Sequence, residues 1–268
     1  MRIVIYPNTY KDKDGAMTQR VRAELTRLGI EHFVFPHGEI RDGDLMLVLG
    51  GDGTVLQAAR QVKEYMVPMI GVNMGTLGYL TEIEPSRIEE ALQQIVRGDY
   101  TVQLRMMLNG QVFFPSGNRA ENWALNDIVI SRCGSLQILA LRIFVNGLFL
   151  HDYYADGVIL TTPTGSTGYN LSAGGPIMEP GANMITLTPI CPHTLNQRSI
   201  VLSAEDEIVV EVLPGKDGSE QNVEASFDGT AGIKLRTGDK IRVVRSEKTT
   251  ELIRLEQTSF LNVLQEKL

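Results

Sequence analysis

Residues 45–62, LMLVLGGDGTVLQAARQV, decide the fold of the N-terminal part of the chain. Leu45 to Leu49 is an unbroken apolar run, which is typical of a strand buried on both faces of a sheet. A glycine-rich turn, 50–54, follows it, and the run from Val55 to Val62 has helical spacing. The stretch therefore predicts a strand, a turn and a helix. That geometry directs backbone N–H groups and a helix N-terminus at one ligand, and it suits a phosphate.

Asp52 sets this turn apart from the common phosphate-binding loops. The turn is not a P-loop, because no Gly-Lys-Ser/Thr follows, and it is not the G-x-G-x-x-G dinucleotide fingerprint. A carboxylate repels a phosphate unless it holds a metal ion or takes a proton from an attacking hydroxyl. The alternative is a tight turn in which Asp52 is only the N-cap of the helix. The turn by itself leaves both interpretations open.

Strands and helices are predicted to alternate through the first 100 residues. Strands are expected at 3–6, 31–35, 45–49 and 68–72, and helices at about 15–28, 55–62 and 86–96. This alternation favours an open α/β domain with a parallel sheet over residues 1–100. Ligands of such sheets bind beyond the carboxyl ends of the strands, where the loops 50–54 and 73–79 lie.

The pattern changes after residue 100, where strand-like runs follow one another without helices. Asn109-Gly110 and Asn146-Gly147 predict hairpin turns of type I′. Strands are expected at 102–108, 111–114, 123–130, 138–145, 148–153, 158–161, 200–202, 208–213, 223–227, 241–244 and 251–255. We therefore predict a β-rich domain over residues 101–256. Residues 257–268 are predicted to form a terminal helix that is too short to be stable alone, so we expect it to return to the first domain.

The composition excludes several classes of protein. A hydrophobic fraction of 43% and a mean hydropathy of −0.04 are typical of a globular protein with a full core. The net charge of −7, without a dense Lys/Arg cluster, disfavours a nucleic-acid partner. Two cysteines are too few for a disulfide framework or a zinc site. No apolar run is long enough to span a membrane. A strand rather than a signal peptide is expected at the N-terminus. We expect a cytoplasmic protein.

A second polar, glycine-rich stretch runs from Thr161 to Pro176. Hydroxyls and glycine amides bind sugar hydroxyls, bases and phosphates without adding charge. The alternative is a surface loop, although long loops in compact domains are often functional. Asn126-Asp127 interrupts the apolar strand 123–130, so at least one of the two is expected to face the core or a site; the alternative is a bulge or an edge position.

Neither glycine-rich stretch has a cation nearby in the sequence. No Lys or Arg occurs between Arg41 and Arg60, or between Arg142 and Arg198. A bound polyphosphate would need backbone N–H groups, a divalent metal such as Mg²⁺ or Mn²⁺, or basic residues folded in from elsewhere. Asp52 beside such phosphates favours the metal.

These motifs resemble the NAD kinase (ATP-NAD kinase) family, in the family's order and over most of the chain. The matching segments are 50–54, 126–127, 156–157, 162–170 and 192–195. The glycine turn is shared with diacylglycerol, sphingosine and phosphofructokinase-type enzymes, whereas 162–170 is much more specific. The resemblance implies an α/β domain followed by a β-sandwich-like domain, with the terminal helix packing back on the first. It also implies homotetramers or dimers whose sites a neighbouring subunit completes.

The resemblance also implies an activity and a set of site residues. ATP would phosphorylate the 2′-hydroxyl of the adenosine ribose of NAD, giving NADP and ADP, with Asp52 as general base and a divalent metal. No residue is assigned as a metal ligand. Residues expected to bind the nucleotides are Gly51, Gly53, Thr54, Tyr79, Asn126, Asp127, Tyr154, Asp156, Thr164, Thr167, Gly168, Tyr169, Asn170, Ser172 and Asp228. Among them, the first three would hold phosphates, Asn126 and Asp127 the adenosine portion of NAD, and Asp156 the nicotinamide end.

Three positions depart from the common family pattern. Many members have alanine at Gly168, glutamate at Asp127 and a basic residue at Tyr154, and the last change bears on the preference for NAD over NADH. Two other functions compete with the NAD kinase prediction. A lipid or sugar kinase would share the glycine turn, and a non-catalytic NAD(P)-binding sensor would need no carboxylate beside phosphates.

Overall fold

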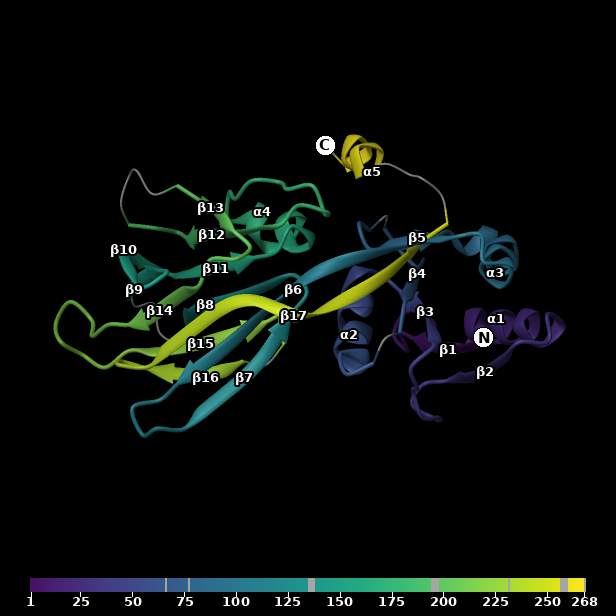
Figure 1. Cartoon of the computed structure of the whole chain (residues 1–268), viewed down its shortest axis with the longest axis horizontal. Coiled ribbons are helices and arrows are strands. Elements are labelled where there is room, and N and C mark those ends of the chain that lie inside the picture. Colours follow the sequence, from purple (N-terminus) through teal and green to yellow (C-terminus); the bar gives the residue numbers. More distant parts are fainter. Residues whose placement is uncertain are drawn as a thin grey trace. The chain divides into compact units, whose positions relative to one another are not determined.

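The computed structural model describes residues 1–65, 67–76, 78–134, 138–193, 198–230, 232–255 and 260–267 (Figure 1). The chain forms two compact units, one comprising Met1–Arg105 and Thr249–Leu268 and the other Met106–Lys248. It passes between them within two long strands, β6 (Thr101–Phe113) and β17 (Lys240–Arg254). Our division at residues 100 and 256 stays a prediction about domains.

The first unit is built on a parallel sheet in the order β2-β1-β3-β4-β5. Its strands are β1 (Arg2–Pro7), β2 (Glu31–Val34), β3 (Asp44–Gly50), β4 (Met69–Asn73) and β5 (Thr81–Ile83). The end of β17 adds one parallel pair, Leu252 with Met69. The helical segments are α1 (Ala16–Arg27), α2 (Asp52–Val62), η1 (Pro85–Arg87), α3 (Ile88–Arg97) and α5 (Phe260–Lys267). The predicted parallel α/β sheet is confirmed, although β5 was not predicted.

Strand β3 lies at the centre of this sheet, and all of its residues are buried. Its alternate residues Leu45, Leu47 and Leu49 belong to the core cluster that includes α1 and α3. Met46 and Val48 are equally buried on the other face, where Val55 of α2 lies against Gly71. Burial on both faces explains why β3 has the unbroken apolar sequence from which we predicted it.

The second unit contains two layers of strands. One layer is a six-stranded antiparallel sheet, in the order β13 (Ile200–Ser203), β12 (Met184–Ile190), β11 (Gly157–Thr161), β8 (Asp127–Arg132), β15 (Asn222–Phe227) and β16 (Ile233–Arg236). The other contains β10 (Leu148–Ala155), β9 (Leu139–Val145), β14 (Ile208–Val212), β17, β6 and β7 (Arg119–Ala124). One apolar cluster combines residues of both layers, such as Ile130 and Leu160 with Leu141 and Val243. The predicted sandwich-like arrangement is confirmed. Two short helices, η2 (Thr164–Thr167) and α4 (Tyr169–Ser172), follow β11.

The two predicted hairpins have different outcomes. Asn146 and Gly147 both have positive φ, 51° and 77°, and they connect β9 to β10 as predicted. The hairpin at Asn109-Gly110 is wrong, because β6 continues through both residues. A Cβ at Gly110 would lie 2.7 Å from the Phe227 ring, so this glycine provides space for core packing. The turn between β6 and β7 is formed by residues 114–118 instead.

Other predicted strand boundaries are also corrected. The strand predicted at 123–130 is two strands, because β7 ends at Ala124 and β8 begins at Asp127. The strands predicted at 241–244 and 251–255 are parts of β17, which is continuous over both. Strands β12 and β16 were not predicted. None of the helices in the described residues is long and apolar enough to cross a membrane.

Candidate active site

The glycine turn joins β3 to α2 as predicted. Gly51 has extended backbone angles at the N-cap position, and α2 begins at Asp52. A Cβ at Gly50 would lie 2.2 Å from Thr54 Oγ1, so no other residue fits there. Thr54 Oγ1 accepts hydrogen bonds from the Gly51 N–H, at 3.4 Å, and from Asn8 Nδ2, at 2.8 Å. These contacts hold the turn against the start of its own helix.

The Asp52 carboxylate is directed at the neighbouring loop after β4. It accepts hydrogen bonds from the backbone N–H groups of Tyr79, at 2.8 Å, and Leu80, at 3.0 Å. A Cβ at Gly78 would lie 2.0 Å from Asp52 Oδ1, so the loop approaches closely only because residue 78 is glycine. The interpretation of Asp52 as the N-cap is therefore wrong. Its carboxylate is oriented by two donors and keeps further lone pairs for a ligand.

Lys11 is a functional candidate that sequence reasoning missed. Its ammonium lies so close to Gly51 and Gly75 that a Cβ at either residue would be 2.9 Å or 3.0 Å from Lys11 Nζ. The glycine turn thus has a cation, supplied by a distant part of the sequence. A signal existed, because the carboxyl ends of neighbouring parallel strands meet at one edge of a sheet. β1 was a candidate neighbour of β3, and Lys11 follows β1 closely.

Two buried oxygen atoms near this edge lack a hydrogen-bond partner among the residues that the structure describes. They are Asn73 Oδ1, at the end of β4, and Thr81 Oγ1, at the start of β5. Asn73 pairs with Gly50, and a Cβ at Gly78 would contact both Thr81 Oγ1 and the Asp52 carboxylate. Buried polar atoms are rarely left unpaired without a ligand or water to complete them. We did not predict either residue as part of the site.

Asp228 shapes the Asn126-Asp127 segment in the second unit. Its carboxylate accepts hydrogen bonds from the backbone N–H groups of Leu125, at 2.8 Å, Asn126, at 2.7 Å, and Asp127, at 3.2 Å. Asp228 itself has a positive φ of 50° and donates its N–H to the Asp127 carbonyl at 3.0 Å. The residue holds the turn between β7 and β8 in place. Its direct contact with a nucleotide stays a prediction.

The side chains of this turn are polar groups in a buried setting. Asn126 Oδ1 is buried and has no hydrogen-bond partner within the described part of the chain. Asp127 is only 6% exposed. Burial, and secondarily the neighbouring Asp228 carboxylate, raise the pKa of Asp127 to about 7. Such groups are suited to accept hydrogen bonds from the hydroxyl and amino groups of a ligand.

The stretch after β11 is an ordered part of the core rather than a surface loop, because Thr161 to Ser166 are all buried. The hydroxyl of Thr162 donates to the Leu125 carbonyl at 2.6 Å, and that of Thr161 to the Asn126 carbonyl at 3.0 Å. The stretch therefore supports the Asn126-Asp127 turn directly. Among the predicted residues, Thr164 and Thr167 lie in η2, Tyr169 and Ser172 lie in α4, and Gly168 lies between the two helices. Tyr169 and Ser172 are exposed.

Asn170 is a different case from its neighbours. It is fully buried, and its Nδ2 donates to the carbonyls of Ser166, at 3.1 Å, and Pro176, at 3.0 Å. Its Oδ1 accepts from Thr188 Oγ1 at 2.7 Å. The amide is thus bonded on both sides within the protein. These hydrogen bonds anchor α4 to the surrounding chain. Direct contact between Asn170 and a nucleotide stays a prediction.

Known proteins match both parts of the chain. Residues 7–100 match the family model described as the ATP-NAD kinase N-terminal domain, and residues 125–255 match the ATP-NAD kinase C-terminal domain. A relative named NAD kinase from Lachnospira eligens is 41% identical, over 98% of both chains. Another, from Lachnoclostridium phytofermentans, is 42% identical over 99% of this chain and 98% of its own.

The chain belongs to the ATP-NAD kinase family. This confirms the enzyme class predicted from the motifs over the lipid or sugar kinase and the non-catalytic sensor. Among solved structures, the NAD kinase from Archaeoglobus fulgidus in complex with ATP has a TM-score of 0.81, with 26% identity and 99% of each chain covered. The yeast NADH kinase complexed with NADH has a TM-score of 0.88 and covers 99% of this chain and 86% of its own, and at 24% identity it shows the fold alone.

The remaining predicted residues of the family site lie apart from the Thr164 segment. Asp156 precedes β11 and Thr164 follows it, so five strand residues, spanning about 17 Å, separate the two ends. Asp156 forms an ion pair with Arg132 at 3.2 Å. Tyr154, where many family members have a basic residue, lies under the Lys216 ammonium, 5.2 Å from the ring centroid. A cation is thus present beside Tyr154, from a different segment of the chain.

A protein-built metal centre is not evident in the described residues, which include no group of three or more His, Cys, Asp or Glu able to hold a metal ion. Mg²⁺ in kinases is typically held by one or two carboxylates together with substrate phosphates. The donor set, with Asp52 beside the glycine turn, fits a metal that arrives on the phosphates. The other motif segment, 192–195, lies partly outside the described residues, since 194–197 are not described.

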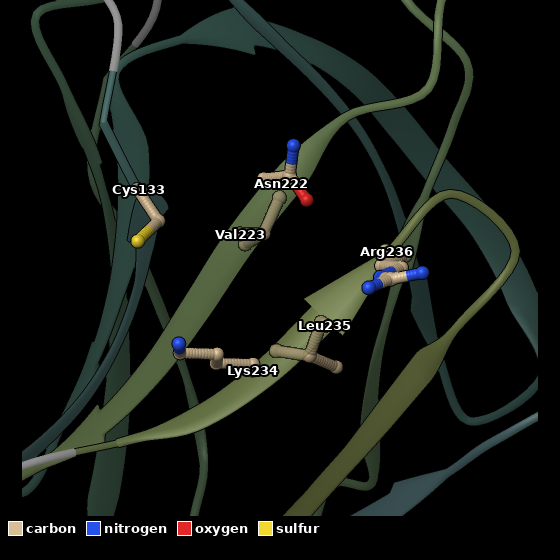
Figure 2. Close-up of a pocket in the computed structure, with 6 residues that line it drawn as sticks. All are labelled: Cys133, Asn222, Val223, Lys234, Leu235 and Arg236. Atoms are coloured by element: carbon tan, nitrogen blue, oxygen red, sulfur yellow. The ribbon is translucent and has the colours of Figure 1, made fainter.

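A pocket of about 280 Å³ in the second unit is separate from all predicted site residues (Figure 2). It is lined by Cys133, Asn222, Val223, Lys234, Leu235 and Arg236. Cys133 follows β8, and the other residues belong to β15 and β16.

Proposed function

We propose that the protein transfers the γ-phosphoryl group of ATP to the 2′-hydroxyl of the adenosine ribose of NAD, giving NADP and ADP. A bond forms between the 2′-oxygen and the γ-phosphorus, and the bond from that phosphorus to the β,γ-bridging oxygen breaks. The proton of the hydroxyl passes to the Asp52 carboxylate, which acts as general base. The observation that carries this proposal is the Asp52 carboxylate, oriented by the Tyr79 and Leu80 N–H groups beside a glycine turn.

The first unit would bind the phosphates. The Gly53 N–H and the start of α2 would provide a donor and a favourable dipole for them, while the Gly51 N–H donates to Thr54 Oγ1 and so fixes the turn beside the phosphates. A divalent metal on the donor, Mg²⁺ or Mn²⁺, would neutralise charge on the phosphoryl group. The ATP complex of the Archaeoglobus fulgidus relative, together with its similar fold, supports ATP as the donor.

The second unit would bind NAD. Asn126 Oδ1 and the Asp127 carboxylate are buried acceptors suited to the amino and hydroxyl groups of the adenosine portion. Thr164, Thr167 and Tyr169 would line the adenine and ribose pockets, with Gly168 and Ser172 beside them, while Asp228 positions the acceptors.

We also propose a homotetramer or dimer in which a neighbouring subunit completes each site. The separation of Asp156 and Tyr154 from the Thr164 segment supports this, because one subunit would present them to the nicotinamide end in another. Light scattering after gel filtration would give the mass, and a monomer with full activity would contradict the proposal.

The direct test of the activity is to incubate the purified protein with NAD, ATP and Mg²⁺ and to measure NADP. An intact fold without NADP would refute the proposed function. Asp52→Asn is expected to keep NAD binding and to lower turnover by about 10²–10⁴-fold, as is usual for the loss of a general base. Asp14→Asn, the same change at an exposed residue, is the matched control. Near-normal turnover of Asp52→Asn would mean that another group accepts the proton.

A further inference from the structure

The turn that follows β1 lies beside the glycine turn. β1 and β3 are neighbouring parallel strands, and their last paired residues are Pro7 and Leu49. The next residue, Asn8, donates its backbone N–H to the Leu49 carbonyl at 2.8 Å. The chain from Asn8 onward is therefore anchored at the point where β3 enters the glycine turn.

Asn8 fixes the backbone of this turn and links it to Thr54. Its side-chain Oδ1 accepts hydrogen bonds from the N–H groups of Tyr10, at 3.0 Å, and Lys11, at 3.2 Å. Its Nδ2 donates to Thr54 Oγ1 at 2.8 Å, in the glycine turn itself. Because one side chain bonds both segments, the backbone of Lys11 is held beside the glycine turn.

Asp12 fixes the other side of Lys11. Its carboxylate is 7% exposed, and it accepts hydrogen bonds from the N–H groups of Met17, at 3.0 Å, and Thr18, at 2.9 Å, and from the Thr18 hydroxyl at 2.5 Å. These bonds attach the turn to the first turn of α1. Lys11 thus lies between Asn8 and Asp12. The Asn8 side chain bonds the backbone at Lys11 itself, and the Asp12 side chain bonds the backbone at the start of α1.

The Lys11 ammonium lies over Gly51 and Gly75, in the space that a side chain at either residue would occupy. A Cβ on these residues would come within 2.9 Å and 3.0 Å of Lys11 Nζ. Within the described part of the chain Lys11 takes part in no ion pair. The ammonium therefore lies beside N–H donors and the start of α2, where the environment favours an anion.

We propose that Lys11 binds the polyphosphate chain of the phosphoryl donor. This inference rests on the proposed function, in which the donor's phosphates lie on the glycine turn. There the negative Asp52 opposes phosphate binding, and the ammonium offsets it. Lys11 thereby supplies the charge that a P-loop obtains from a lysine within the loop itself. The acceptor, in contrast, is assigned to Asn126 and Asp127.

The test compares Lys11→Met, which removes the charge at similar length, with Lys13→Met, the same change at an exposed lysine two residues along. A charge-assisted hydrogen bond to phosphate is typically worth a factor of about 10 to 100 in affinity. We expect KM for ATP to rise by about that factor in Lys11→Met, with KM for NAD unchanged. Lys13→Met should behave like the wild type, and Lys11→Arg should keep most of the affinity for ATP.

Calorimetric titration with inorganic triphosphate, without NAD, gives a second readout that does not depend on turnover. Lys11→Met should bind triphosphate about 10- to 100-fold more weakly than the wild type, with a weaker dependence on salt. If the wild type binds triphosphate but makes no NADP, the proposed function fails while the role of Lys11 is still measured. Three results would overturn the inference. The two methionine variants could bind ATP and triphosphate equally well, Lys11→Met could raise only the KM for NAD, or Lys11→Arg could lose as much affinity for ATP as Lys11→Met.

Discussion

Asp127 should give the protein a characteristic dependence of stability on pH. Burial and the Asp228 carboxylate raise the pKa of Asp127 to about 7 in the folded state, against an ordinary value of 3.8. Between these values the unfolded chain releases the proton and the folded chain keeps it. Stability from this group is therefore fully present below pH 3.8 and is lost as the pH rises through 7. The difference between the two pKa values corresponds to about 4 kcal/mol.

Asp127→Asn removes the titrating group while keeping a similar shape. Relative to the wild type, the variant should gain about 4 kcal/mol of unfolding free energy between pH 4 and pH 8. The assay is urea unfolding of both proteins across this range. All other titrating groups are common to the two proteins and largely cancel in the difference.

Asp14→Asn, the same change at an exposed carboxylate, is the control for the substitution itself. If the difference between Asp127→Asn and the wild type is the same at pH 4 and pH 8, Asp127 is not held protonated by its surroundings. Our reasoning about this buried carboxylate would then be refuted.

Three glycines give further predictions. Gly78→Ala should lower turnover by at least about 10-fold with NAD binding retained, as measured by initial rates and calorimetry. Its Cβ would lie 2.0 Å from Asp52 Oδ1 and would misplace the proposed base. Gly110→Ala should lower the unfolding free energy by about 1–3 kcal/mol in urea, because its Cβ would lie 2.7 Å from the Phe227 ring; an unchanged midpoint would contradict this. Gly168→Ala should change the rate and stability only slightly, because its Cβ would meet one atom closely, the Gly165 carbonyl oxygen at 3.3 Å, which a shift of a few tenths of an ångström relieves. A large loss in either quantity would contradict this.

The parallel sheet of the first unit could be predicted because each strand is short, apolar and separated from the next by a helix or turn. β3 illustrates this, since its burial on both faces requires the apolar run that identified it. The structural role of Gly110 could not be predicted from the sequence in the same way. The pair Asn109-Gly110 has the composition of a tight turn, and only the position of Phe227, far along the sequence, shows that the glycine makes room for a ring.

The candidate site divides along similar lines. Asp52 stands out in the sequence because it lies in a glycine turn that follows an apolar strand, and the Asn126-Asp127 pair stands out because it interrupts an apolar run. Lys11, Asn73 and Thr81 do not, since their relevance depends on which strands are neighbours. Asp228 also lies about 100 residues from the turn that it holds, and a local pattern indicates nothing of such a contact. Composition and spacing identify candidate functional residues within one segment. The order of the strands in the sheet determines which segments lie at the same site.

The first unit is discontinuous in sequence, and this limits how the protein can be divided. The second unit is in effect an insertion, entered within β6 and left within β17, with no linker at either crossing. A fragment that ends near residue 100 would lack Thr249–Leu268, including Leu252, which pairs with Met69 of β4. A chimera that exchanges the second unit between relatives therefore has to be joined at two places, near residues 105 and 248, and both joints fall inside strands. Matching the register of β6 and β17 across those joints is the main design constraint for recombining these enzymes.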